Sequence, residues 1–235
     1  MSIFQFKQFS VAHERSTLKI GVDAVLLGAW ISVDNTQTIL EIGTGCGVIS
    51  FMLAQRSQAH LTAIDIDSDS IEEAEYNNSH SPWKNRISFH CIDIESFTKE
   101  NQGKTFDCIV CNPPYFDHSL LSPNPRLNLG KHNVCLTFEC LSACVHSLLH
   151  PQGNFFCIIP ASSLPKMENA CHKQGMYLSR ACYVKSFPEK EPHRVLLCFE
   201  QIKKTPITEY LTIRDNPKTY STDYCNLTKE FYINM

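Results

Sequence analysis

The residues with the clearest chemical meaning form a glycine-rich turn at residues 39–47, where the chain reads Ile-Leu-Glu-Ile-Gly-Thr-Gly-Cys-Gly. An apolar run with β-branched residues precedes the glycines and an amphipathic stretch follows, so the pattern predicts a strand, a tight turn and a helix. Glycine lets a ligand lie against the backbone, and a helix start offers free N–H groups. About twenty residues later Asp65 ends a second apolar run, where a carboxylate can hold ribose hydroxyls. The segment predicts a nucleoside-binding α/β domain, although an ordinary glycine-rich turn can look the same.

The spacing of the glycines indicates which nucleoside cofactor would bind. The dinucleotide pattern G-x-G-x-x-G would need a third glycine at position 48, which is Val48. The chain instead reads Glu41-x-Gly43-x-Gly45-x-Gly47, with an acid inside the strand. A carboxylate beside the loop disfavours a pyrophosphate and suits a cationic sulfonium. We therefore expect S-adenosylmethionine rather than NAD, with these four residues around its methionine part.

A second group of residues follows the predicted strand at 106–111, which runs into Asn112-Pro113-Pro114-Tyr115. Prolines cannot continue a strand ladder, so the chain must leave the sheet there, at the edge where ligands bind in open parallel sheets. The side chain of Asn112 and the backbone of Pro113 offer carbonyl oxygens, and Tyr115 offers a ring for stacking on a base. These three residues are our candidates for holding an exocyclic amine as a nucleophile. The alternative is a purely structural Pro-Pro turn.

The glycine turn and the N-P-P-Y sequence together resemble the class I, Rossmann-like, S-adenosylmethionine-dependent methyltransferases of the N-P-P-Y type. More narrowly, the chain resembles the bacterial tRNA1(Val) adenine-N6-methyltransferase family, which modifies the adenine next to the anticodon, at position 37. The resemblance runs nearly from end to end. It rests also on these blocks: Phe6-Lys7-Gln8-Phe9, Val11-Ala12-His13, Lys19-Ile20-Gly21-Val22-Asp23, Leu27-Gly28-Ala29-Trp30, Ser81-Pro82-Trp83, Pro192-His193-Arg194-Val195-Leu196-Leu197, Tyr220 and Phe231-Tyr232.

Apolar runs and amphipathic stretches alternate from residue 38 onwards, which predicts a parallel sheet. We expect a helix at 22–31, strands at 38–43, 60–65, 87–92 and 106–111, a helix at 136–150, a strand at 154–160, a helix at 162–174, and strands near 177–186 and 194–200. The fold class is α/β, a Rossmann-like methyltransferase domain with a seven-stranded, mostly parallel sheet, one antiparallel edge strand and helices on both faces. We expect a single domain, divided into an N-terminal arm and helix (1–31), a catalytic core (32–204) and a C-terminal extension (205–235). The resemblance implies that the extension adds a strand and a helix at the sheet edge.

Several other residues have more than one interpretation. The resemblance implies that the residue at Asp93 accepts a hydrogen bond from the adenine amine of the cofactor, but a loop aspartate here could equally cap the turn at 94–98. After Asp67, the spacing Ser70-x-x-Glu73 predicts a capping box. The N-terminal region could close over the cofactor, as the resemblance implies, or could be a packed arm.

The predicted RNA contacts come from two parts of the chain. The long connection at 116–133 carries Arg126, Lys131 and His132 just after the N-P-P-Y turn, and loops of this length are usually functional or disordered. We interpret it as a substrate-gripping loop; a solvated loop is the alternative. The family usually has arginine before the histidine, and Lys131 keeps the charge but loses the bidentate fork. Arg194 could bind phosphate or pair with a core carboxylate.

Composition limits the partners, the metal sites and the cellular locations that the chain can have. The 235 residues carry a net charge of −3, which counts mildly against an RNA partner, although a local basic face suffices. The twelve cysteines predict no metal site, because Cys108 and Cys111 would point to opposite faces of a strand. We find no secretion signal and no apolar run long enough to span a bilayer. We therefore expect a cytoplasmic protein without a metal site, and a monomer; the resemblance implies that its partner is tRNA.

The expected reaction is an in-line transfer of the sulfonium methyl group to the adenine N6, which needs no metal because the cofactor is already activated. One alternative is another amine or amide substrate, such as a protein glutamine, an rRNA base or a DNA base. A second alternative is a non-catalytic subunit that only binds the cofactor. The intact glycine turn and N-P-P-Y sequence disfavour the second alternative.

Overall fold

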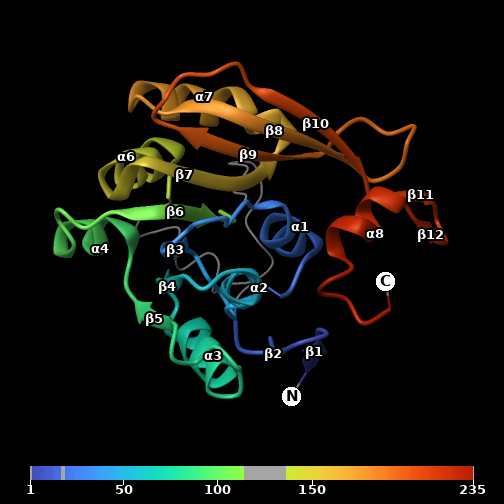
Figure 1. Ribbon diagram of the computed structural model, residues 1–235, viewed down its shortest axis with the longest axis horizontal. Helices are drawn as coiled ribbons and strands as arrows, with labels where there is room; N and C mark the ends of the chain where they lie inside the picture. Colours follow the sequence, from blue (N-terminus) through green and yellow to red (C-terminus); the bar gives the residue numbers. More distant parts are fainter. Residues whose placement is uncertain (1, 17–18, 114–135, 235) are drawn as a thin grey trace.

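The computed structural model describes residues 2–16, 19–113 and 136–234, and all structural statements below concern these ranges. An eight-stranded sheet crosses the molecule in the order β10-β8-β9-β7-β6-β3-β4-β5 (Figure 1). Its strands are β3 (Thr38–Ile42), β4 (His60–Asp65), β5 (Ile87–Cys91), β6 (Phe106–Cys111), β7 (Leu149–Pro160), β8 (Tyr177–Lys185), β9 (Arg194–Glu200) and β10 (Ile207–Thr212).

The sheet confirms the expected α/β, Rossmann-like class and differs from the expectation in one detail. Strand β9 pairs antiparallel with both β7 and β8, and every other pairing in the sheet is parallel. The antiparallel strand β9 therefore lies inside the sheet, between β7 and β8, and the parallel strand β10 occupies the edge beside β8. This eighth strand comes from the C-terminal segment, where the resemblance implied an added strand and helix.

Helices cover both faces of the sheet. One face packs against α1 (Val22–Trp30), α2 (Val48–Arg56), α3 (Ser68–Ser79) and α8 (Thr222–Thr228); the other packs against α4 (Ile94–Glu100), α6 (Phe138–Leu148) and α7 (Leu164–Lys173). The central strands are continuous apolar runs because both of their faces are buried. Cys108 lies in the apolar core beneath α1, α2 and α3, and Cys111 lies in the core beneath α4, α6 and α7. This confirms that they point to opposite faces of the strand. Within the described ranges, no helix is long and apolar enough to cross a membrane.

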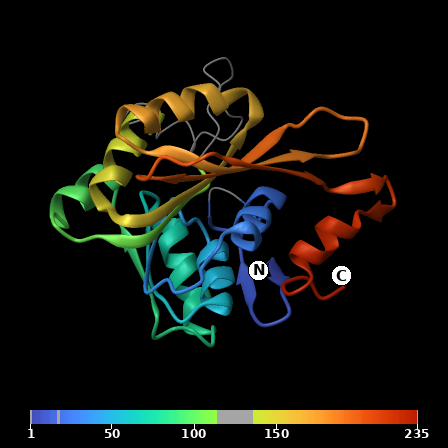
Figure 2. The same ribbon diagram turned by 45° about the horizontal axis from the view of Figure 1, so that its top comes forward.

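The N-terminal arm folds onto this framework as an antiparallel hairpin of β1 (Ile3–Gln5) and β2 (Ser10–Ala12). The backbone N–H of Lys7 donates to the carbonyl of Phe231 (2.8 Å), and the rings of Phe6 and Tyr232 stack at 6.0 Å. The two ends of the chain therefore lie side by side, as Figure 2 shows. A short hairpin, β11 (Arg214–Asn216) with β12 (Thr219–Tyr220), precedes α8.

The predicted capping box at the start of α3 is wrong. Asp67 is the N-cap, and its carboxylate accepts from the N–H of Ser70 at 3.0 Å, so the helix begins before the predicted box. Glu73 is buried and binds the arm instead, accepting from the backbone N–H groups of residues 14, 15 and 16 at 2.8, 2.9 and 2.8 Å. Burial alone would raise the pKa of Glu73, but these hydrogen bonds outweigh it and the pKa is lowered.

We predict that Glu73→Ala releases the arm, because three N–H groups lose their acceptor. The free energy of unfolding should fall by about 3 kcal/mol, and amide exchange at residues 14–16 should accelerate. Since the folded-state pKa lies below the ordinary 4.5, the wild-type protein should lose this contribution as the pH falls below about 4.5. Urea denaturation and hydrogen exchange measure both effects. Glu75→Ala, an exposed position on the same helix, is the control and should change neither.

Candidate functional site

The candidate residues gather along the edge where the parallel strands end, which we call the carboxyl edge. Strands β6, β3, β4 and β5 are neighbours in that order, and they are followed or ended respectively by Asn112, the turn 43–47, Asp65 and Asp93. Because neighbouring strands lie about 4.8 Å apart, the row spans roughly 15 Å. Chain order also reverses between β3 and β6, which is where doubly wound sheets bind nucleotides.

The three glycines of the turn have different tasks. Gly43, Gly45 and Gly47 all have positive φ angles of 73°, 54° and 88°. A Cβ on Gly43 or Gly45 would meet no described atom within 4 Å, so the backbone is bare on a side where a ligand can lie. A Cβ on Gly47 would lie 2.9 Å from the ring of Phe51 and 3.1 Å from that of Phe89. Gly47 therefore allows α2 to pack closely against the sheet, and Gly43 and Gly45 leave bare backbone that fits a cofactor; a contact between Gly47 and the cofactor stays a prediction.

Glu41 is a buried acid directly beneath this turn, with 1% of its surface exposed. Its Oε2 accepts from the hydroxyl of Thr44 at 2.9 Å and from the hydroxyl of Ser50. Its Oε1 is buried and receives no hydrogen bond from any described residue. Burial is the largest cause that raises the pKa of Glu41 to about 7. An unsatisfied buried oxygen beside bare glycines fits a ligand with positive charge, as S-adenosylmethionine has.

Asp65 is fixed at the end of β4 by two backbone hydrogen bonds. Its Oδ2 accepts from the N–H of Gly45 at 2.8 Å, and its Oδ1 accepts from that of Asp67 at 3.0 Å. Burial raises the pKa of Asp65 despite these bonds. Each carboxylate oxygen can accept a further hydrogen bond, so the position fits the predicted contact with ribose hydroxyls.

Asp93 and Asn112 stand at the two ends of the row. Asp93 caps α4: its Oδ1 accepts from the N–H of Ser96 at 2.8 Å, and this bond is the main cause that lowers the pKa of Asp93. The capping interpretation is thus confirmed, and the contact with the cofactor adenine stays a prediction. Asn112 is partly buried and Pro113 is buried, directly after β6. The other predicted residues, Tyr115 of the N-P-P-Y turn and Arg126, Lys131 and His132 of the long connection, lie outside the described residues.

Arg194 begins β9 at the carboxyl edge, opposite the end of β7. Its Nε donates to the carboxylate of Asp23, in the first turn of α1, at 2.8 Å. Of the two sequence interpretations, the structure shows the pairing with a carboxylate. A contact between Arg194 and RNA phosphate stays a prediction.

Asn77 is a residue of the site that the sequence interpretation missed. Its Nδ2 donates to the carbonyls of Ala12 (2.9 Å) and Cys46 (3.0 Å), and its Oδ1 accepts from the N–H of Ala12 (2.9 Å). This buried amide thereby joins the N-terminal arm, α3 and the glycine turn. The available signal was its spacing of four from Glu73, which places both on one helix face; its polar neighbours at 76–79 hid that signal.

Comparisons with known proteins agree with this geometry. The family described as a methyltransferase domain matches residues 34–213. The chain is 44% identical to the tRNA1(Val) (adenine(37)-N6)-methyltransferase of Phocaeicola vulgatus over 232 residues, which are 99% of this chain and 98% of the relative. It is 38% identical to the protein of the same name from Pseudoalteromonas translucida over 236 residues, covering 100% of both chains.

The chain belongs to the tRNA1(Val) (adenine(37)-N6)-methyltransferase family. Membership confirms the resemblance found in the sequence and the expectation of an S-adenosylmethionine-dependent methyltransferase. The fold itself is similar to that of a predicted O-methyltransferase from Agrobacterium tumefaciens, with a TM-score of 0.68 at 16% identity over 89% of this chain and 96% of that one. This more distant likeness shows the fold alone.

We predict that Glu41→Gln removes a pH dependence of stability. In the protein without cofactor, the raised pKa means that the folded state holds its proton more tightly than the unfolded state does. The wild-type free energy of unfolding should therefore fall by about 3 kcal/mol as the pH rises from about 4.5 to about 7, and should level off above.

Glu41→Gln should lose this slope, because the amide stays neutral and its oxygen can still accept from Thr44 and Ser50. At pH 8 the variant should also bind S-adenosylmethionine about tenfold or more weakly, the equivalent of about 1.4 kcal/mol or more. Urea denaturation across the pH range and calorimetry with the cofactor measure the two effects. An unchanged slope in the variant would contradict the assignment; Glu75→Gln is the exposed control.

We predict that Asn77→Ala weakens cofactor binding by about tenfold, since the glycine turn loses its hydrogen bonds to α3 and the arm. The KM for S-adenosylmethionine should rise while kcat changes little, because no reacting group is removed. Steady-state kinetics together with a thermal melt separate this effect from simple loss of folded protein. If kcat falls by the same factor as KM rises, at a temperature where the variant is fully folded, a positioning role is contradicted.

Proposed function

We propose that this protein transfers the methyl group of S-adenosylmethionine to the N6 amine of adenine 37 in tRNA1(Val). The observation that carries the proposal is the 44% identity over nearly the whole length of a relative that bears this activity in its name. The arrangement of the carboxyl edge supports it independently. Its four positions follow the order in which a methyltransferase needs them: target amine, methionine, ribose and adenine.

Each position has a stated task in this proposal. Gly43 and Gly45 hold the methionine part against bare backbone, above the carboxylate of Glu41. Asp65 accepts from the ribose hydroxyls and Asp93 from the adenine amine. The bound cofactor supplies a methyl carbon that its sulfonium charge has already activated. The protein contributes position and orientation, which can lower a barrier by several kcal/mol.

The target amine is handled by the residues after β6. We assign the side-chain oxygen of Asn112 and the backbone carbonyl of Pro113 as acceptors of the two amine hydrogens. An aromatic amine is a poor nucleophile while its lone pair is conjugated with the ring, and two acceptors on its hydrogens favour a pyramidal nitrogen. We assign Tyr115 the task of stacking on the target base, and Arg126, Lys131, His132 and Arg194 contacts with the RNA backbone.

The free-energy cost of bringing a base into the site also favours this substrate. Adenine must leave its stack, which costs a few kcal/mol and least where the base is already unpaired. A position beside the anticodon lies in such a loop. We propose that the protein acts as a monomer, in the cytoplasm where tRNA is modified.

We predict that the purified protein forms N6-methyladenosine in unmodified tRNA1(Val) transcripts, and that Asn112→Ala reduces the rate by at least about a hundredfold, because an acceptor for the amine is lost. Labelled S-adenosylmethionine and nuclease digestion identify the product nucleoside. Asn169→Ala, an exposed amide on α7, is the matched control and should keep full activity.

The outcome that would overturn the proposal is intact cofactor binding with no label in any tRNA. Another amine or amide, such as a protein glutamine, an rRNA base or a DNA base, would then be the favoured substrate. Assays on those separated pools would identify it.

A further inference from the structure

Two tyrosines, one partly buried and one exposed, form an aromatic pair near the end of the sheet that lies away from the cofactor residues. Tyr183 of β8 and Tyr210 of β10 are register partners, and their rings stack with centroids 5.6 Å apart and an angle of 24° between planes. Tyr210 is 69% exposed, although large aromatic side chains are usually well buried. Tyr183 packs against the apolar core on the α4, α6 and α7 face of the sheet, whereas the ring of Tyr210 is largely exposed.

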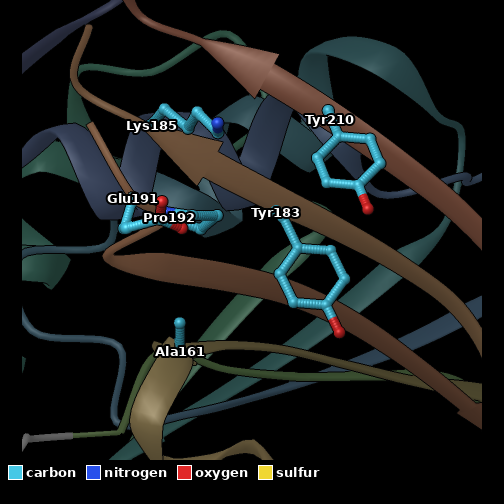
Figure 3. Close-up of a pocket in the computed structure, with 6 residues that line it drawn as sticks. All are labelled: Ala161, Tyr183, Lys185, Glu191, Pro192 and Tyr210. Atoms are coloured by element: carbon cyan, nitrogen blue, oxygen red, sulfur yellow. The ribbon is translucent and has the colours of Figure 1, made fainter. Parts of the chain in front are cut away.

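The pair borders a hollow of about 390 Å³ that is also lined by Ala161, Lys185, Glu191 and Pro192 (Figure 3). Lys185 ends β8, so the hollow opens at the same carboxyl edge as Asn112. Strands β7 and β9 lie between β6 and β8, and β10 is one strand further. At about 4.8 Å per strand, the tyrosines lie roughly 14 to 19 Å along the edge from the end of β6. A single nucleotide cannot fill both places, but one RNA molecule can.

The chemistry of the lining favours a nucleobase. Flat aromatic rings are the surfaces on which proteins stack unpaired bases, whatever the base. The ammonium group of Lys185 supplies positive charge for a phosphate at the rim of the hollow. The carboxylate of Glu191, which also faces the hollow, would repel a phosphate but can accept hydrogen bonds from the N–H groups of a base edge. The hollow thus combines a stacking surface, one cation and one acceptor.

We propose that Tyr183, Tyr210 and Lys185 form a second RNA-contacting surface, on which an unpaired base of the tRNA substrate stacks while the target adenine occupies the methylation site. This inference rests on the proposed function for the identity of the RNA. A second copy of the chain, paired through the exposed edge strand β10, is the competing occupant, and the experiment distinguishes the two.

The test compares three variants of β10 in kinetics with full-length tRNA transcripts and in direct binding of the same RNA. Tyr210→Ala should raise the KM for tRNA and weaken RNA binding roughly 5- to 100-fold. Its kcat and its affinity for S-adenosylmethionine should stay unchanged, which a general loss of structure would not allow. Tyr210→Phe keeps the ring and should behave as the wild type. Ile207→Ala is the matched control, because Ile207 is 61% exposed on the same strand and three residues away, so its side chain points to the opposite face.

A second measurement tests the cation. Lys185→Ala should reduce the slope of log affinity against log salt concentration by about one, as expected when one phosphate contact is lost. Unchanged RNA affinity in both Tyr210→Ala and Lys185→Ala would overturn the proposal. A Tyr210→Ala protein that changes from dimer to monomer in light scattering, with RNA affinity unaltered, would show instead that the surface joins two copies.

The two proposals fail in different ways. If the wild type binds tRNA through these residues but methylates none, the RNA surface stands and the assigned reaction falls. If the wild type methylates tRNA and the Tyr210→Ala variant does so with the wild-type KM, the reaction stands and the second surface falls.

Discussion

The arrangement of the site depends on the parallel pairing of β3 between β4 and β6. Ile42 pairs with Ile64 on one side and with Cys111 on the other, so three strands end at the same height. A shift of one residue in either pairing would turn every side chain of that strand to the other face. Both faces of these strands are buried in separate apolar cores, which makes such a shift very costly. The chemistry at the edge is therefore positioned by a register that the hydrophobic cores enforce.

Two buried acids near this edge show opposite ways of placing a carboxylate in the protein interior. Glu73 receives three backbone N–H groups, so its charge is fully used to hold the N-terminal arm. Glu41 receives hydroxyl groups on one oxygen only, and its pKa rises to about 7 as a result of burial. Glu73 therefore stabilises the fold in the absence of a ligand. Glu41 has one oxygen without a hydrogen bond from any described residue, and we propose that a positively charged ligand above the glycine turn would stabilise its charged form.

The sequence predicted the regular elements well because their signals are local. The strands β3, β4, β5 and β6 end within one residue of the predicted positions, since each is a compact apolar run bounded by turn residues. The errors concern partners that are distant in sequence. The capping box failed because Glu73 is taken by residues 14–16, 57 to 59 positions away along the chain. The place of β9 inside the sheet was missed because it depends on β9 pairing with both β7 and β8, a strand order that local apolar patterns do not specify. Asn77 was missed because its partners, Ala12 and Cys46, are also distant in sequence.

The basic residues in the C-terminal third also have structural partners that the sequence could not reveal. Arg180 makes two hydrogen bonds to Glu209, at 3.0 and 3.1 Å, and its guanidinium lies 4.1 Å from the ring centroid of Trp30. Arg194 pairs with Asp23. Two arginines that would otherwise count toward an RNA-binding face are thus engaged in joining β8, β9, β10 and α1. In a chain with a net charge of −3, each engaged arginine reduces the positive charge that is available to a polyanion. Stacking on an exposed aromatic ring supplies affinity without adding positive charge, and this is the contribution that we propose for the tyrosine pair of β8 and β10 at the carboxyl edge.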